Sequence, residues 1–139
     1  MIVLDTNVIS ALMRPRLHAE IIAWLDEQPP SSIWTTAISI LETRSGIYLL
    51  PAGRRREDLN AALDGLLDHT IEGRTLPFDR AAAEISATII GRRVPNGRNV
   101  GTRDTQIAGI VMSRNATLAT RNLRDFEDLD IALINPWKD

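Results

Sequence analysis

The sequence predicts an α/β domain built around a mostly parallel sheet, and three observations lead to this prediction. Short apolar runs alternate with stretches of helical periodicity along the chain. The helical stretches are long enough to cross over between parallel strands, as in βαβ units. The length of 139 residues suits one domain, and no internal repeat or long linker divides it. We therefore expect a single domain over 1–139, with helices on both faces of the sheet.

The first half of the chain contains two predicted strands and three predicted helices. The apolar run at 2–4 ends in a carboxylate and is typical of a buried strand. Ile21, Trp24 and Leu25 have helical spacing, and the prolines at 29 and 30 end that helix. A strand over 32–35 leads to Thr36, a favoured helix-capping residue. The predicted elements are a strand at 2–4, a helix at 18–28, a strand at 32–35, a helix at 36–49 with Ile38, Leu41, Ser45 and Leu49 along one side, and an amphipathic helix at 55–68.

The second half predicts three further strands and two further helices. Asp79 is placed to cap a helix that turns Ala82, Ile85 and Ile89 inward. Glycine and proline mark 91–102 as a loop. The predicted elements are a strand at 75–78, a helix from 79, a loop at 91–102, a helix at 103–114 with Ile107, Ala108 and Val111 inward, and strands at 116–120 and 131–134.

The amino-acid composition excludes several classes of site and protein. The chain has no cysteine, so it forms neither disulfides nor thiolate metal sites. Its two histidines, His18 and His69, lie in different helical contexts, which argues against zinc. No apolar run approaches the roughly 20 residues of a membrane-spanning helix, and residues 1–4 are too short for the apolar core of a signal peptide. We expect a soluble, cytoplasmic enzyme or binding module.

The basic residues are almost all arginine and lie in local groups. All but one of the 16 basic residues are Arg, and the exception is Lys138. Arginine binds phosphate through a two-point fork of N–H donors, whereas lysine acts as a point charge. The groups lie at 54–56, 92–103 and 121–124. They reflect either an arginine-rich genome or, as their placement favours, a polyanion held beside an acidic centre.

Three carboxylates occupy positions that are unusual for a carboxylate. Asp5 closes the first strand, Glu42 borders the buried side of a helix, and Asp104 lies in the first turn of another helix. Each has a purely structural alternative. Asp5 is a good helix N-cap, Glu42 suits a solvated helix edge, and Asp104 would gain about 0.3–1 kcal/mol from the helix dipole. Because ligands bind at the carboxyl ends of parallel strands, the three together favour one acidic site.

Metal-assisted phosphodiester hydrolysis is the chemistry that uses such carboxylates together. Mg²⁺ and Mn²⁺ prefer oxygen ligands and keep several waters, so about two to four carboxylates suffice. The cation lowers the pKa of a bound water, orients the phosphate and neutralises charge on the leaving oxygen. Clustered carboxylates without a cation would repel one another. The sequence therefore predicts a site for Mg²⁺ or Mn²⁺.

Four ordered motifs resemble those of a known protein family. They are IVLDTN at 2–7, TTAISILE at 35–42, RDTQIAGI at 103–110, and ATRNLRDF at 119–126 followed by LINPW at 133–137. In order and in separation they resemble the motifs of PIN-domain toxins, namely the VapC group and its FitB-like branch. The resemblance extends from one end of the chain to the other.

This resemblance implies a fold, an activity and partners. The fold is a PIN-like three-layer sandwich with a central, mostly parallel sheet flanked by helices, usually in a homodimer. The activity is an endoribonuclease that uses Mg²⁺ or Mn²⁺ and cleaves RNA, in the toxin of a type II toxin–antitoxin system. A cognate antitoxin of the VapB or FitA type silences it, and DNA is contacted only through the antitoxin. The antitoxin would lie in a hydrophobic groove, with an arginine toward the acids. The helices around 21–25 and 41–49 are the candidates for that groove, although most of their apolar side chains are expected in the core.

The resemblance also assigns roles to particular residues. Asp5 and Asp104 would bind the metal, and Glu42 would be a third ligand or the base for the attacking water. Thr6 and Asn7 would steady the first loop.

Two positions depart from the family pattern. Many members have an acid where this chain has Asn122, which would contact a metal-bound water or phosphate; Asp125 is placed to supply the missing charge, and a second metal depends on it. Arg103 stands where small residues are common, and it would either pair with a carboxylate or contact RNA phosphate.

Other enzyme classes with an acid after the first strand lack support in this sequence. A response-regulator receiver domain needs a lysine near its phosphoacceptor, and a haloacid-dehalogenase phosphatase needs Asp-x-Asp and a core lysine. This chain has Asp5-Thr6-Asn7 and only Lys138, and it has no phosphate-binding glycine loop. The remaining alternative is a PIN-fold module that binds RNA or a partner and has lost its catalysis. The three retained acids favour the active enzyme.

Overall fold

Five parallel strands form the central sheet of the computed structural model, which describes residues 1–98 and 101–137. The strands are β1 (Ile2–Leu4), β2 (Ile33–Thr36), β3 (Thr75–Leu76), β4 (Thr117–Ala119) and β5 (Ala132–Ile134), in the spatial order β3-β2-β1-β4-β5. All four pairings are parallel. The predicted α/β class with a parallel sheet is confirmed, with each strand within about two residues of its expected bounds.

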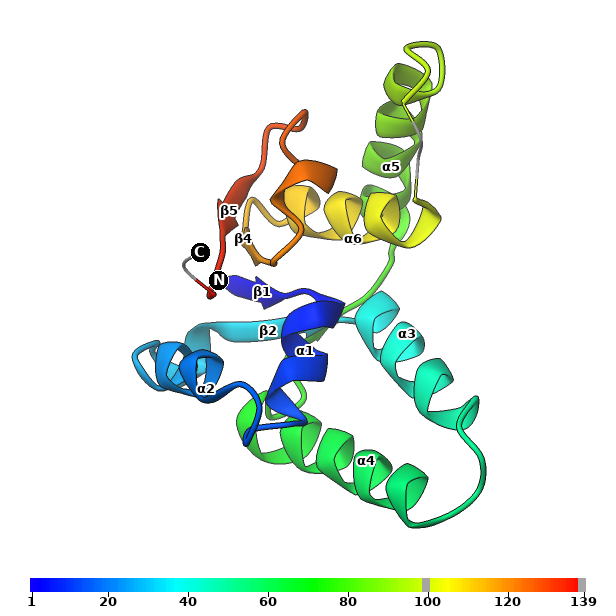
Figure 1. The fold of residues 1–139 in the computed structure, drawn as a ribbon. Helices are drawn as coiled ribbons and strands as arrows, with labels where there is room; N and C mark the ends of the chain where they lie inside the picture. Colours follow the sequence, from blue (N-terminus) through cyan, green and yellow to red (C-terminus); the bar gives the residue numbers. More distant parts are fainter. Residues whose placement is uncertain (99–100, 138–139) are drawn as a thin grey trace.

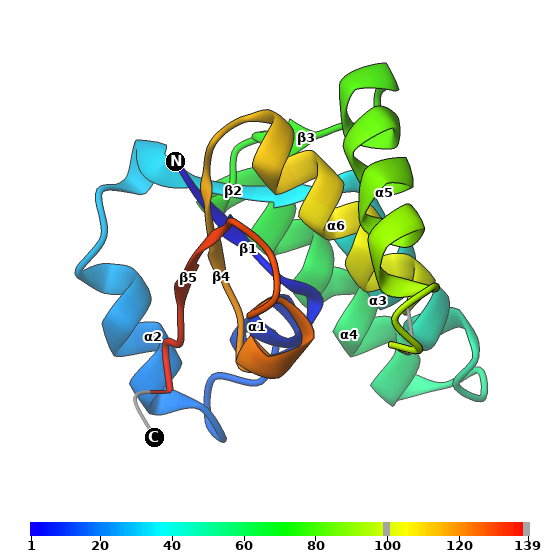
Figure 2. The ribbon, with the colours of Figure 1, turned by 90° about the horizontal axis from the view of Figure 1, so that it is seen from above.

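Six helices cover the two faces of this sheet. They are α1 (Thr6–Leu12), α2 (Ala19–Asp26), α3 (Ala37–Tyr48), α4 (Arg54–Gly65), α5 (Arg80–Arg93) and α6 (Thr102–Ser113). In Figure 1, α5 and α6 lie on one side of the strands, and α1, α2 and α4 lie on the other. Figure 2 shows the same arrangement from above, with α5 and α6 in front of the sheet. The three-layer sandwich is therefore as expected.

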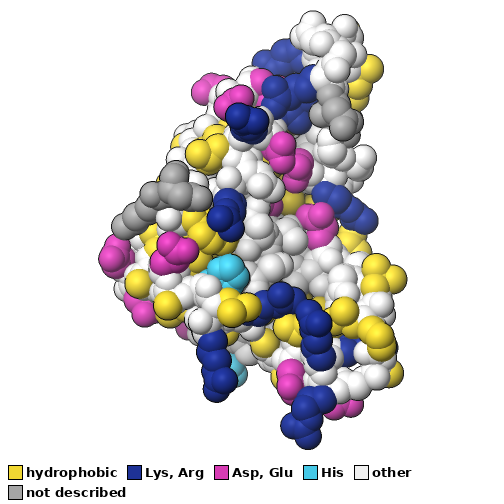
Figure 3. Space-filling view, viewed as in Figure 1, with side chains coloured by type: hydrophobic (Ala, Val, Ile, Leu, Met, Phe, Trp, Pro, Cys, Tyr) yellow, Lys and Arg dark blue, Asp and Glu magenta, His cyan; other side chains and the backbone are white. Residues whose placement is uncertain are grey.

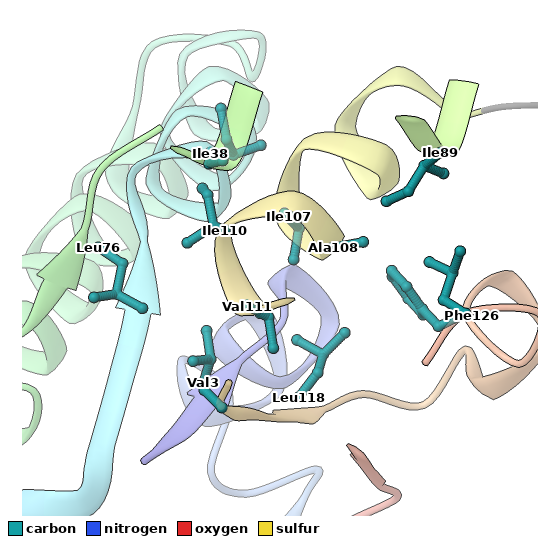
Figure 4. Packing of buried hydrophobic residues seen from close by; sticks show 13 residues of the cluster. Val3, Ile38, Leu76, Ile89, Ile107, Ala108, Ile110, Val111, Leu118 and Phe126 are labelled. Carbon is teal, nitrogen blue, oxygen red and sulfur yellow. The ribbon is translucent and has the colours of Figure 1, made fainter. Parts of the chain in front are cut away.

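Alternating side chains of the central strands build two separate cores. Val3 and Leu118 are fully buried on the face that α5 and α6 cover, where they meet Ile107 and Val111 (Figure 4). Leu4 points to the opposite face and packs with residues of α1, α2 and α4. Successive side chains of a strand point to opposite faces, so a strand buried on both sides is apolar throughout. This explains why the run at 2–4 has no polar position.

α5 and α6 pack closely against each other, and this fixes the position of α6, which carries Asp104 in its first turn. A Cβ added at Gly109 of α6 would lie 2.5 Å from the carbonyl oxygen of Ala82 and closer still to the Ser86 hydroxyl. The Ser86 hydroxyl donates a hydrogen bond to the carbonyl oxygen of Thr105 at 3.1 Å. Only glycine allows the two helices to pack at this distance.

Three expectations about helices require correction. A helix at 6–12, where α1 forms, was not among the predicted elements and was considered only as the structural alternative for Asp5. The expected loop at 91–102 begins later, because α5 continues through Arg93, whose side chain is buried. Residues 99 and 100 of that loop, like Lys138, lie outside the described residues. On α3 the buried residues are Ile38, Ser39, Thr43 and Ile47, whereas Leu41 and Leu49 are 44% and 86% exposed.

Across residues 1–98 and 101–137, none of the helices combines the length and the apolar character that crossing a bilayer demands.

Candidate active site

The candidate site lies where the sheet changes direction. The chain runs from β1 outward to β2 and β3, and later places β4 on the other side of β1. In parallel α/β sheets such a switch point leaves a crevice at the carboxyl ends of the strands. Asp5 follows β1, Thr36 ends β2 and starts α3, and Thr120 follows β4. The topology therefore brings three sequence motifs to one edge.

Asp5 is buried and held by hydrogen bonds to both of its carboxylate oxygens. It is 3% exposed. The backbone N–H of Thr6 donates to Oδ1 at 2.8 Å, and the Thr120 hydroxyl donates to Oδ2 at 2.7 Å. The Asn7 amide lies 3.5 Å from Oδ2 and 3.3 Å from the Thr120 hydroxyl. Asp5 is also the N-cap of α1, so its structural alternative holds together with its place in the site.

The pKa of Asp5 is raised above its ordinary value of 3.8, chiefly because burial disfavours the charged form. The hydrogen bonds from Thr120 and Thr6 lower it in part, and the negative charges of Glu42 and Asp125 raise it further. The pKa of Asp5 therefore responds to acids from two other parts of the chain, Glu42 on α3 and Asp125 after β4.

Glu42 is tied to the first motif through Thr6. The Thr6 hydroxyl donates to Glu42 Oε1 at 2.7 Å and lies 3.2 Å from the Ser39 hydroxyl. The backbone N–H of Ser39 in turn donates to the Thr36 hydroxyl, which caps α3. Because α3 starts at the end of β2, its first turns hold Glu42 against α1. The glutamate is half-buried and hydrogen-bonded, and it is not a freely solvated helix edge.

Asp104 completes the group from the first turn of α6. Its pKa is raised from 3.8 to about 6, first by burial and then by the negative charges of Asp5, Asp125 and Glu42. The Asp104 and Asp125 carboxyl groups also share a hydrogen bond, which favours the protonated form of Asp104. The four carboxyl groups thus lie close enough together for the charges of their neighbours to raise the pKa values of Asp5 and Asp104.

The remaining candidate residues lie at the rim of this edge. The Asn7 side-chain oxygen accepts the N–H of Arg121 at 3.2 Å, so Asn7 ties the first loop to the fourth motif. Asn122 is exposed, and its backbone N–H donates to the Thr120 hydroxyl at 3.1 Å. Of these two residues, Asp125 is the one whose side chain lies beside the Asp104 carboxyl group. Arg103 is exposed and forms no ion pair with any described residue.

Sequence reasoning missed Thr120 and Ser39. Both are fully buried hydroxyl residues, and both hydrogen bond within the acidic edge. Thr120 stands in the fourth motif directly after a strand, and that position was the available signal. Ser39 gave no signal, because a serine in a helix next to its cap usually serves the cap alone.

The acids suit a hard divalent cation as donors, although they form no finished cage. Among the described residues, no three His, Asp or Glu side chains are arranged so that they could hold a metal ion as they stand. Each Asp5 oxygen accepts one short hydrogen bond and has two lone pairs, so each keeps acceptor capacity. Mg²⁺ needs only one or two carboxylates besides water. A cation would also relieve the repulsion that raises the pKa of Asp104.

Basic side chains surround the acidic ones on this side of the molecule. Figure 3 shows acidic side chains in the middle of the view, with Lys and Arg side chains above, below and beside them. A hollow of about 240 Å³ opens next to Glu42 and Thr6, between α1, α3 and the start of α4, and Arg14 lies at its side. A negatively charged ligand that approaches the acids would thus meet arginines first.

Comparisons with known proteins bear on the family to which this chain belongs. The family model described as PIN domain matches residues 2–132. The VapC ribonuclease Y4jK of Sinorhizobium fredii is 36% identical over 138 residues, 99% of each chain, and the toxin FitB of Neisseria gonorrhoeae is 36% identical over 139 residues, 100% of each chain. The solved structure of FitAB bound to an IR36 DNA fragment matches with a TM-score of 0.87 at 35% identity, over 99% of this chain and 96% of that one. The resemblance seen in the sequence is confirmed, and the chain belongs to the PIN-domain family, among the VapC and FitB proteins.

Proposed function

We propose that this protein is the toxin of a type II toxin–antitoxin pair and that it is an endoribonuclease dependent on Mg²⁺ or Mn²⁺. The observation that supports the proposal most is the convergence of Asp5, Glu42, Asp104 and Asp125 at one edge, where burial and the charges of the other three acids raise the pKa of Asp104 to about 6. Clusters of acids that disfavour their own ionisation are typical of functional sites. One relative is named a VapC ribonuclease and another a toxin, which agrees with both halves of the proposal.

The roles of the acids follow from their surroundings. Asp5 and Asp104 would hold the cation, which when bound neutralises phosphate charge and lowers the pKa of water. Glu42, oriented by the Thr6 hydroxyl at 2.7 Å, acts as a third ligand or takes the proton of the attacking water. Asn122 and Arg103 are exposed at the rim, where they would meet the phosphates of the RNA.

The antitoxin would occupy the hollow beside Glu42. The acid lies at one end of this hollow, and Ile47, Leu50 and Leu59 give it an apolar wall. A helix or extended segment with apolar anchors and one arginine fits this chemistry, since the arginine would neutralise the acids. The hollow is lined from α1, α3 and α4, whereas the region at 21–25 is mostly built into the core. Contact with DNA through the antitoxin, a homodimeric state and a cytoplasmic location belong to the same proposal; the FitAB relative was solved on DNA.

The test is RNA cleavage by the protein purified free of antitoxin. Total RNA is incubated with Mg²⁺, Mn²⁺ or EDTA, for the wild type and for Asp5→Asn and Asp104→Asn. Glu84→Gln is the matched control, because Glu84 is an exposed acid on α5 outside the site. We expect metal-dependent cleavage by the wild type and the control, and loss of about 100-fold or more in both site variants. RNA that is bound but left intact under every metal would indicate the binding module without catalysis.

A further inference from the structure

Arg93 is a buried arginine that donates hydrogen bonds from Nε and Nη2 to the segment that holds Asp125. Its side chain is 4% exposed, at the last turn of α5. Its guanidinium donates to both carboxylate oxygens of Asp128, from Nε at 2.9 Å and from Nη2 at 2.7 Å. Nη2 also donates to the backbone carbonyl oxygen of Asp125 at 2.6 Å. A buried charge with this bidentate geometry holds its partners firmly, because any displacement leaves it unpaired.

The segment that Arg93 holds has little internal structure of its own. Asp125 ends a 3₁₀ helix of three residues (Leu123–Asp125), whose turn is closed by few backbone hydrogen bonds. Such short turns depend on outside contacts. Here the contacts are the Arg93 bonds, a bond from Arg98 to the carbonyl oxygen of Arg124 at 2.6 Å, and the buried ring of Phe126.

The held segment faces the acidic site directly. A small hollow of about 30 Å³ is lined by Arg93, Arg98, Gly101, Asp104 and Asp125, so both arginines and both acids border the same space. The carboxyl groups of Asp125 and Asp104 lie within hydrogen-bonding reach of each other. The line of contacts therefore runs from the end of α5, through the Asp125 backbone, to the acid on α6.

We propose that Arg93 is a positioning residue for the acidic site: by binding the Asp128 carboxylate and the Asp125 carbonyl oxygen, it sets the Asp125 carboxylate beside Asp104 as the fourth acid. This inference rests on the proposed function, since it assigns to Asp125 a part in holding the cation. It also accounts for a charged residue at the end of a helix that would otherwise be expected to remain in water.

The experiment measures Mn²⁺ affinity of the free protein by electron paramagnetic resonance, which reports binding without RNA or cleavage. The variants are Arg93→Met, Asp125→Asn and the double variant. Groups that orient metal ligands typically contribute about 10- to 100-fold to affinity. We expect about 10-fold weaker Mn²⁺ binding in each single variant. The double variant should bind no more weakly than Asp125→Asn alone, because Arg93 acts through Asp125.

Arg74→Met is the matched control for a purely structural effect. Arg74 also anchors backbone carbonyl oxygens, those of Ile33, Pro30 and Thr70, but it lies at the opposite edge of the sheet. Its replacement should lower stability and leave Mn²⁺ affinity within about twofold of the wild type. If Arg93→Met does not fold, Asp128→Asn is measured in its place, because Asp128 is more exposed than Arg93. Asparagine keeps one of the two oxygens that accept from Arg93, so one of the two hydrogen bonds between Arg93 and residue 128 is lost. About 3-fold weaker Mn²⁺ binding is then expected.

The outcomes separate this inference from the proposed function. Mn²⁺ binding and RNA cleavage by the wild type, with unchanged affinity in Arg93→Met or its substitute, overturn the inference and leave the function standing. If the double variant binds Mn²⁺ about 10-fold more weakly than Asp125→Asn alone, the inference is also overturned, because Arg93 would then act by another route. A wild type that neither binds Mn²⁺ nor cleaves RNA overturns both.

Discussion

Replacing Asp104 with asparagine should stabilise the metal-free protein at neutral pH and leave its stability unchanged at acid pH. The pKa of Asp104 is about 6 in the folded chain and ordinarily 3.8. Between these values the folded chain binds more protons than the unfolded chain, so its stability falls as the pH rises. The full cost is present above pH ~6 and vanishes below pH ~4. Asparagine keeps the shape of the side chain and removes the charge that creates this cost.

The difference between the two pKa values corresponds to at most about 3 kcal/mol. Asp104 is only partly buried, and solvent screens its interactions, so we expect about 1–2 kcal/mol at pH ~7.5. Urea unfolding in EDTA, for wild type and variant at several pH values between ~4 and ~7.5, measures the difference. A difference that stays constant over this range would refute the reasoning, as would a variant less stable than the wild type at neutral pH.

Three further predictions follow from individual contacts and from the cation. Gly109→Ala should destabilise the protein by about 3 kcal/mol or more in urea unfolding, because the new Cβ would lie 2.5 Å from the Ala82 carbonyl oxygen, whereas Gly91→Ala on α5 meets nothing within 4 Å and should gain about 0.5–1 kcal/mol; equal effects would contradict this. Thr6→Val should slow RNA cleavage about 10-fold, because Glu42 loses its donor, and Thr6→Ser should restore the rate; a fast Thr6→Val enzyme would show that the hydroxyl is dispensable. Mg²⁺ at ten times its Kd should stabilise the wild type by about 1.4 kcal/mol in urea unfolding, and Asp104→Asn by less; equal stabilisation would place the cation elsewhere.

The layers of the fold were predictable because the period of the hydrophobic pattern survives in most elements, and α1 shows where this fails. Residues 6–12 are few, and Thr6, Val8 and Ile9 are β-branched, so their intrinsic helix propensity is low. The helix forms because Asp5 caps it and because Val8, Ile9 and Leu12 pack into the core. The cap is local and could be read from the sequence, whereas the packing comes from tertiary structure, which a local pattern does not contain.

The misplaced face of α3 has a related cause. The pattern of Leu41 and Leu49 pointed to the wrong side, because two of the residues buried on this helix are the polar Ser39 and Thr43. Ser39 is buried next to the acids, where it hydrogen bonds to Thr6 and Thr36, and the apolar pattern weakens there. The same holds for the choice between Asn122 and Asp125. Three residues of spacing in a loop do not predict which side chain lies beside Asp104. In the structure both side chains are exposed, and Asp125 lines the hollow that Asp104 borders.

Asp5 and Asp104 differ in how far the fold itself explains them. Asp5 caps α1 and receives two short hydrogen bonds. Asp5→Asn keeps an oxygen that can cap the helix, but it removes the charge and the oxygen that accepts from Thr120 together, so loss of cleavage in that variant alone would not separate these two effects. For Asp104 the structural alternative was stabilisation by the dipole of α6, which would favour its charged form and lower its pKa. Its pKa is instead raised to about 6, by burial and by three neighbouring acids. A carboxylate held where its charge costs free energy is not explained by the stability of the helix that carries it, and a bound cation is the kind of ligand that would turn this cost into affinity.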